Sequence, residues 1–167
     1  PPEDRAVTHA VDALVGPHDA VATQVTGGDR LSYLDDVLTQ RVEGAPSGTA
    51  TSGLLLDAHG APMLVTDLAL LDDRVVLVTP RGCQEAVDRL LAGRTFLADA
   101  RFAALEGTRV VRVVGPDAVA LVAEVLAVDL EPGRALEADE EVVLALPDGV
   151  LVVTSDATGR REALVAA

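Results

Sequence analysis

Apolar residues recur along this chain with two spacings, one typical of helices and the other of strands. Residues 3–15 carry a helical stripe that ends before Gly16-Pro17, whereas residues 19–26 alternate as a strand does. The full pattern predicts helices over 3–15, 30–42, 82–92 and 117–127, strands over 19–26, 50–57, 62–71, 74–79, 108–114, 140–146, 149–155 and 162–167, a further strand within 95–105, and a polar connection over 128–139.

One part of the pattern occurs twice. Residues 24–38 read QVTGGDRLSYLDDVL and residues 112–126 read RVVGPDAVALVAEVL. Each copy is a β-branched run, a Gly-x-Asp turn and a helix with apolar spacing, and we expect Asp29 to be the N-cap of its helix. The two predicted hairpins also resemble each other, with VVLVT in the first and VLVVT in the second. The repeat indicates a duplicated fold.

The order of these elements predicts an α+β protein with antiparallel sheets. We expect two ferredoxin-like β-α-β-β halves that share one core. The first half covers residues 1–106 and the second covers residues 107–167, with the join near Gly107. The second half is expected to be truncated at its C-terminus.

The composition limits the core and the partners. Hydrophobic residues make up 49% of the 167 residues but aromatic residues only 2%, so the core must be built from Val, Leu and Ala. The formal net charge of -14 opposes binding to a nucleic-acid backbone, which needs clustered cations. No apolar run reaches the roughly 18 residues that span a bilayer, and no signal-peptide pattern is present. We therefore expect a cytoplasmic protein with neither a nucleic acid nor a membrane as partner.

Several catalytic motifs are absent. The chain has no Lys, which excludes a Walker-type phosphate loop and a Schiff-base lysine. Its three His and single Cys are widely spaced and predict no metal site. The lone Cys83 excludes an intrachain disulfide. An ordinary residue at the start of a helix is the favoured interpretation of Cys83, and a reactive thiol is the alternative.

Three short motifs follow one another in the first half. They are Gly27-Gly28-Asp29, Thr39-Gln40-Arg41-Val42 and Asp57-Ala58-His59-Gly60. In this order they resemble the N-terminal region of the folate-binding aminomethyltransferase superfamily, which includes the glycine-cleavage T-protein and its YgfZ-like relatives. The second half is similar to the family's second Gly-Pro-x-Ala segment through VVRVVGPDAVALVAEVL. The similarity covers roughly residues 19–167 and implies the N-terminal folate-binding domain of the aminomethyltransferase fold.

The Asp-x-x-Gly turn, and the absence of a T-protein-style Gly-Gly-x-x-Asp-Asp run, favour the YgfZ-like branch. This resemblance implies a tetrahydrofolate-binding protein that supports iron–sulfur protein maintenance or one-carbon metabolism. The implied partners are a folate and iron–sulfur proteins. Two alternatives stay open: a folate-dependent aminomethyltransferase of the T-protein type, and a non-catalytic interaction module that has lost the ligand.

The branch signature Lys-Gly-Cys-Tyr-x-Gly-Gln does not occur in this chain. The run Arg81-Gly82-Cys83-Gln84-Glu85 imitates it at the start of a helix, where the family has no signature. In the family the signature lies further along than this sequence extends. We therefore expect this chain to be a fragment or a shortened relative, with the missing C-terminal region of the same protein as a partner.

Asp67 is the main candidate for a site residue. In T-proteins the matching carboxylate holds the pterin and orients one-carbon transfer. A carboxylate suits this task because it can hydrogen-bond the ring and stabilise a developing iminium cation. The resemblance therefore implies a catalytic and folate-binding role for Asp67. The alternation along its strand leaves open whether the side chain faces the central cavity or solvent.

Two more residues are candidates for folate binding. Glu162 follows Thr158-Gly159-Arg160-Arg161, and this segment resembles the family's Thr-Gly-Glu-x-Gly-aromatic-Glu, whose last Glu binds the pterin. The alternative for Glu162 is a solvated strand end. Tyr33, the only tyrosine, could stack on an aromatic ligand, although a core anchor is the favoured interpretation.

Overall fold

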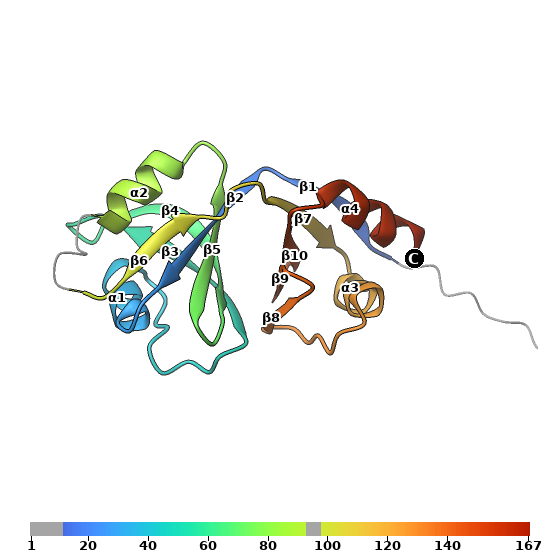
Figure 1. Ribbon diagram of the computed structural model, residues 1–167, viewed down its shortest axis with the longest axis horizontal. Coiled ribbons are helices and arrows are strands. Elements are labelled where there is room, and N and C mark those ends of the chain that lie inside the picture. Colours follow the sequence, from blue (N-terminus) through green and yellow to red (C-terminus); the bar gives the residue numbers. More distant parts are fainter. Residues whose placement is uncertain (1–11, 93–97) are drawn as a thin grey trace, which may run out of the picture.

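The structure is a computed structural model that describes residues 12–92 and 98–167, and these residues form two five-stranded antiparallel sheets and four helices (Figure 1). The first sheet consists, in spatial order, of β3 (Thr49–Leu56), β4 (Pro62–Leu70), β5 (Arg74–Pro80), β2 (Ala20–Thr26) and β6 (Arg101–Ala104). The second consists of β1 (Leu14–His18), β7 (Arg109–Val114), β10 (Gly149–Thr154), β9 (Glu141–Leu146) and β8 (Ala135–Ala138). The helices are α1 (Arg30–Val37), α2 (Gln84–Ala92), α3 (Ala118–Leu126) and α4 (Ala157–Ala166). The predicted α+β class is confirmed.

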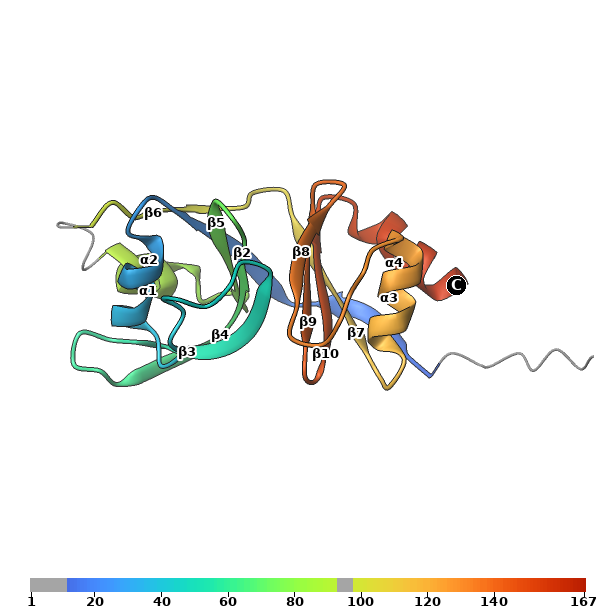
Figure 2. The same ribbon diagram turned by 90° about the horizontal axis from the view of Figure 1, so that it is seen from below.

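The two sheets face each other in the middle of the molecule, and the helices cover their outer faces (Figure 2). Helices α1 and α2 pack on the first sheet, whereas α3 and α4 pack on the second. The layer between the sheets pairs small side chains with larger ones. The first sheet supplies Ala20, Ala22, Ala50, Ala69, Val76 and Val78, and the second supplies Val110, Ala135, Val142, Leu144, Leu146, Leu151 and Val153. None of the helices in the described residues is both long and apolar enough to cross a membrane.

The repeated Gly-x-Asp turn holds an edge strand in each half. In the first half the amide of Asp29 donates to the carbonyl of Asp99 (3.1 Å), and the Asp29 carboxylate accepts from the amide of Asp99 (2.8 Å), just before β6. In the second half Asp117 makes the same two bonds with Asp12, just before β1 (3.4 and 2.8 Å). Asp29 occupies the N-cap position of α1, but its side chain makes no cap hydrogen bond. The predicted N-cap position of Asp29 is confirmed, but its carboxylate bonds to the segment before β6 instead of to the first turn of the helix.

Strand β1 belongs to the second sheet although β2, directly after it, belongs to the first. It pairs antiparallel with β7 along its whole length. The chain therefore crosses from the second sheet to the first between His18 and Ala20, and crosses back between β6 and β7. The predicted join near Gly107 falls in that second crossing.

The first predicted helix, over 3–15, lies largely outside the described residues. Where the structure describes it the prediction is wrong, because Leu14 and Val15 belong to β1 and pair with Val114 and Val113. Pro17 lies within this strand. Pro is tolerated there because β1 is an edge strand, where one side of the backbone needs no sheet partner.

The last predicted strand, over 162–167, is also wrong, because these residues fall at the end of α4 and just after it. Asp156 starts this helix, and its carboxylate accepts a hydrogen bond from the amide of Gly159 (3.0 Å). Arg160 then anchors the helix to β9. Its Nε and Nη2 lie 3.0 and 2.8 Å from the two carboxylate oxygens of Glu141, which is only 6% exposed. Leu164 also holds the helix in place, because it packs into the apolar cluster between the second sheet and helices α3 and α4.

Two smaller differences have local causes. Helix α1 ends at Val37 rather than near residue 42, because the Asp35 carboxylate accepts the amides of Val42 and Glu43 and turns the chain back. Strand β8 lies inside the predicted polar connection. Its turn into β9 uses Asp139 and Glu140, both at positive φ, where a turn signal from Gly or Asn would be expected.

Replacing Gly27 or Gly115 by Ala should lower the free energy of unfolding by at least about 2 kcal/mol. Both glycines have positive φ, and an added Cβ would stand 2.0 Å from the Asp99 carbonyl oxygen or 2.4 Å from that of Asp12. Gly16→Ala is the matched control because no atom lies within 4 Å of its added Cβ. Urea unfolding measures all three variants. Equal stability of Gly16→Ala and Gly115→Ala would contradict the role of the turns.

Glu141→Gln should lower the free energy of unfolding by about 3–5 kcal/mol, because it leaves the guanidinium of Arg160 largely buried without its counter-charge. The exposed pair of Arg101 and Asp99 (3.5 Å) provides the control. Arg101→Gln should cost less than about 1 kcal/mol. Thermal or urea unfolding compares the two, and a similar loss for both would show that α4 is not held by this pair.

Candidate functional site

Strand β4 extends past the layer that joins the two sheets. Residues Asp67–Leu70 pair with β5, whereas the pairing of β4 with β3 continues back to Pro62. Alternate side chains of a strand share a face, so Val65 and Asp67 lie on the same face as Ala69, which packs between the sheets. Asp67 is half-buried and Val65 is exposed. The side chain of Asp67 therefore faces the second sheet, at the margin where the apolar layer ends.

The strand register sets the neighbours of Asp67. Ser52 on β3 and Val78 on β5 stand opposite it on either side. The Ser52 hydroxyl donates a hydrogen bond of 2.6 Å to Oδ1 of Asp67. One carboxylate oxygen is thus held in place by the sheet, and the carboxyl group has a defined orientation toward the space between the halves.

The second half supplies the opposite wall. Arg112 on β7 lies two residues after Val110, which packs between the sheets. The two side chains therefore share a face of the strand, and Arg112 also faces the first sheet. Its guanidinium donates to the carboxylate of Asp148, in the turn between β9 and β10. His18, at the end of β1, joins them. Together with Asp67 and Ser52 they line a cleft of about 400 Å³, called here the Asp67 cleft.

Burial and charge act on the two titratable groups that face each other here. Burial raises the pKa of the Asp67 carboxyl, and the negative charge of Asp148 adds to this, while the Ser52 hydrogen bond, Arg112 and His18 oppose it. The pKa of His18 is lowered, first by burial and then by the positive charge of Arg112. The site combines a carboxyl group that gives up its proton less readily than usual with an imidazole that takes one less readily.

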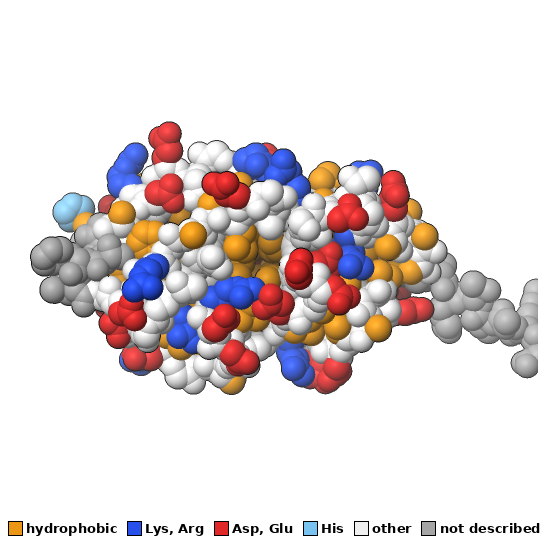
Figure 3. Space-filling model, viewed as in Figure 1, with side chains coloured by type: hydrophobic (Ala, Val, Ile, Leu, Met, Phe, Trp, Pro, Cys, Tyr) orange, Lys and Arg blue, Asp and Glu red, His pale blue; other side chains and the backbone are white. Residues whose placement is uncertain are grey.

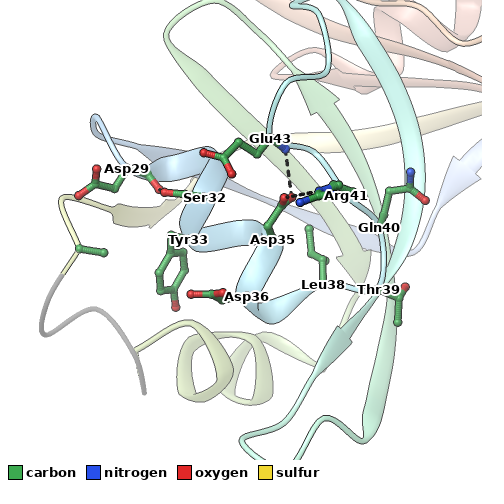
Figure 4. A pocket seen from close by; sticks show the side chains of 11 residues that line it. Asp29, Ser32, Tyr33, Asp35, Asp36, Leu38, Thr39, Gln40, Arg41 and Glu43 are labelled. Carbon is green, nitrogen blue, oxygen red and sulfur yellow. Dashed lines mark hydrogen bonds and ion pairs between the residues drawn. The ribbon is translucent and has the colours of Figure 1, made fainter.

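A larger hollow of about 700 Å³ lies beside α1 (Figure 4). Tyr33 lines this hollow, but the residue is only 4% exposed, and its ring stacks on Phe102 with centroids 6.3 Å apart. Its hydroxyl donates to the carbonyl of Leu91. Asp35 is held by the backbone beyond the helix and by Arg41. Tyr33 is thus placed in the core of the first half, and the structure does not bring it to Asp67.

Glu162 lies on α4, which covers the face of the second sheet turned away from the first. Its side chain is exposed and does not line the Asp67 cleft. The residues that do meet Asp67 were missed in the sequence. Arg112 carried a signal, since it interrupts a run of valines in VVRVV. Ser52, His18 and Asp148 become neighbours of Asp67 only through the register and the crossing of β1. Within the described residues, no three or more His, Cys, Asp or Glu gather as a metal site would require.

Comparison with known proteins supports the fold. No family model matches the sequence, and no curated protein matches it either. Among solved structures, the glycine cleavage system aminomethyltransferase T from Bartonella henselae superposes with a TM-score of 0.80 over 93% of this chain, at 20% identity. The heterotetrameric sarcosine oxidase from Corynebacterium sp. U-96, in complex with pyrrole 2-carboxylate, matches 92% of this chain and 82% of its own with a TM-score of 0.62, at 12% identity. This chain spans about half, 46%, of the aminomethyltransferase. The fold is therefore of the aminomethyltransferase type, as predicted.

Asp67→Asn should become more stable relative to the wild type as pH rises from the ordinary Asp pKa of 3.8. The native protein keeps the Asp67 proton at pH values where the unfolded chain has lost it, so the wild type loses stability as pH rises through the raised native pKa. The amide of Asn does not titrate. Urea unfolding from pH 3 to pH 8 measures the difference, with the exposed Asp72→Asn as the control that should show no such trend. A wild-type advantage that grows with pH would contradict the raised pKa.

Proposed function

We propose that this chain belongs to a tetrahydrofolate-binding protein of the YgfZ-like kind, and that the pterin ring of the folate lies in the Asp67 cleft. The observation that carries the proposal is the position of Asp67. It faces the space between the two halves, is oriented by Ser52, and lies across from Arg112. The fold that holds it is shared with an aminomethyltransferase T.

The chemistry of the cleft suits a reduced pterin. The pyrimidine edge of the ring offers adjacent N–H donors, which a carboxylate accepts well, and a carbonyl oxygen that a guanidinium can bind. Val78, Pro80 and Pro147 give the cleft apolar walls for the faces of a flat ring. A volume of about 400 Å³ also falls in the ordinary range for small-molecule sites. Asp67 would hold the pyrimidine edge while Ser52 fixes the direction of the carboxylate.

The role of the bound folate rests on the sequence resemblance to the YgfZ-like branch, which favours support of iron–sulfur proteins or one-carbon metabolism. A second candidate is aminomethyl transfer, and the raised pKa of Asp67 favours it because a carboxyl group that holds its proton more firmly than usual is better suited to proton transfer. Incubation with tetrahydrofolate and an aminomethylated carrier protein separates the two. Formation of methylenetetrahydrofolate supports the transferase, and binding without turnover supports the first role.

Calorimetric titration with 5-formyltetrahydrofolate should give binding at micromolar concentration, and Asp67→Ala should weaken it by about tenfold to a hundredfold. That loss corresponds to one hydrogen bond to a charged group. Glu162→Gln is the control, because Glu162 lies on the far side of the second sheet and its loss should leave the affinity unchanged. Unchanged binding by Asp67→Ala would favour a ligand-free interaction module or a site elsewhere.

A further inference from the structure

Two carboxylates, those of Asp67 and Asp148, line the Asp67 cleft together with one arginine, Arg112. Arg112 donates to Asp148 and pairs with it. Asp67 accepts the hydroxyl of Ser52 and makes no ion pair with any residue in the described ranges 12–92 and 98–167. The cleft therefore holds one carboxylate that is paired with the arginine and one that is not.

The turn between β9 and β10 presents Asp148 to Arg112. A Cβ added to Gly149 would stand 2.5 Å from the carbonyl oxygen of Val113, so the turn lies directly against β7, one residue after Arg112. Because the two backbones are so close, the carboxylate of Asp148 reaches the guanidinium. The hairpin backbone therefore sets the position of Asp148, and the side chain of Arg112 follows it.

Little else fixes the guanidinium of Arg112. Gly16 stands opposite Arg112 on β1, and no atom lies within 4 Å of a Cβ added there, so the arginine has open space on that side. Within the described residues, the guanidinium makes no hydrogen bond besides the one to Asp148. Other carboxylates are plentiful, since the chain has 27 acidic residues and 13 basic ones, and Figure 3 shows the two kinds intermingled over one face of the molecule. Without Asp148, the guanidinium is free to turn to another carboxylate.

The charges around Asp67 agree with this arrangement. Burial raises the pKa of the Asp67 carboxyl most, and the hydrogen bond from Ser52 on β3 opposes it. The charge of Asp148 raises this pKa further, whereas Arg112 on β7 and His18 on β1 lower it by smaller amounts. An arginine in direct contact would instead hold the pKa of a carboxyl below its usual range. The charge of Arg112 therefore reaches Asp67, but it acts there more weakly than the charge of Asp148.

We propose that Asp148 is a positioning residue, which holds the guanidinium of Arg112 at the β9–β10 turn and so keeps it from forming an ion pair with Asp67. The inference rests on the proposed function, because a carboxylate without an ion pair can accept the N–H groups of a pyrimidine edge. A guanidinium has five N–H donors, so Arg112 keeps others for a carbonyl oxygen of the ligand. Asp148 thus leaves both groups available to the ligand.

A double-mutant cycle on the ligand-free protein tests the inference. NMR of isotope-labelled carboxyl groups follows the pKa of Asp67, and the signal is identified by its absence from Asp67→Asn. Arg112→Gln should raise this pKa at least about twice as far in Asp148→Asn as in the wild type, because the freed guanidinium then pairs with Asp67. Asp148 is exposed and Asn suits a turn, so Asp148→Asn should fold normally. Equal rises in the two backgrounds would show that Asp148 acts only through its charge, and the inference would be wrong.

Calorimetric titration with 5-formyltetrahydrofolate measures the consequence for binding. Asp148→Asn should bind about two- to fivefold more weakly than the wild type, as expected when the ligand must first break one partly exposed ion pair. Glu137→Gln is the matched control, because Glu137 also pairs with an arginine, Arg74 (2.7 Å), but does not line the Asp67 cleft. The control should change neither the affinity nor the pKa of Asp67.

The two measurements separate the inference from the proposed function. Equal or tighter binding by Asp148→Asn overturns the inference and leaves the proposed function standing. If the wild type binds no folate, the proposed function fails, and the NMR titration alone decides whether Asp148 holds Arg112 away from Asp67.

Discussion

The fold depends on one repeated contact, in which a Gly-x-Asp turn grips the backbone just before an edge strand. Gly27 and Gly115 bring the chain so close to a carbonyl that no side chain fits, and the Asp two residues on accepts the amide of the residue that bears the carbonyl. One turn fixes β6 to the first sheet and the other fixes β1 to the second. The sequence repeat is thus the trace of a repeated backbone contact rather than of two helix caps.

The position of β1 leads from this contact to the site. Because Asp117 holds the backbone at Asp12, the following strand enters the second sheet beside β7. The chain must then cross to the first sheet directly after His18, and the crossing places His18 between the two halves. His18 lines both the Asp67 cleft and a second hollow of about 400 Å³. The long-range hydrogen bond between Asp12 and Asp117 therefore helps to place His18 beside Asp67 and Arg112.

Sequence patterns predicted most of the strands, three of the four helices in the described residues and the fold class, because alternation and helical spacing report burial on the element itself. The patterns failed where contacts with another part of the chain determine whether a segment forms a helix or a strand. Leu14 and Val15 form a strand because β7 offers them an edge, and residues 157–166 form a helix because Asp156 caps it and Glu141 holds Arg160. The facing of Asp67 was open for the same reason, since alternation gives two faces and only the second sheet shows which one is inside. Tyr33 was a candidate because of its residue type and Glu162 because of a motif. Neither residue type nor motif predicts whether a side chain lies near Asp67 in the folded chain.

The site lies where the apolar layer between the sheets ends, and the same residues end that layer and form the site. On the first sheet, the side chains that face the second sheet change from the apolar Ala69 to the charged Asp67. On the second sheet, the side chains that face the first change from Val110 to Arg112. The two halves present opposite charges across the gap, and each is already engaged, Asp67 by Ser52 and Arg112 by Asp148. Burial nevertheless raises the pKa of Asp67, so its charged form is less favourable in the native protein than in the unfolded chain. A carboxylate that burial disfavours, placed at an open margin with its orientation fixed by Ser52, is the arrangement on which the proposed binding role of Asp67 rests.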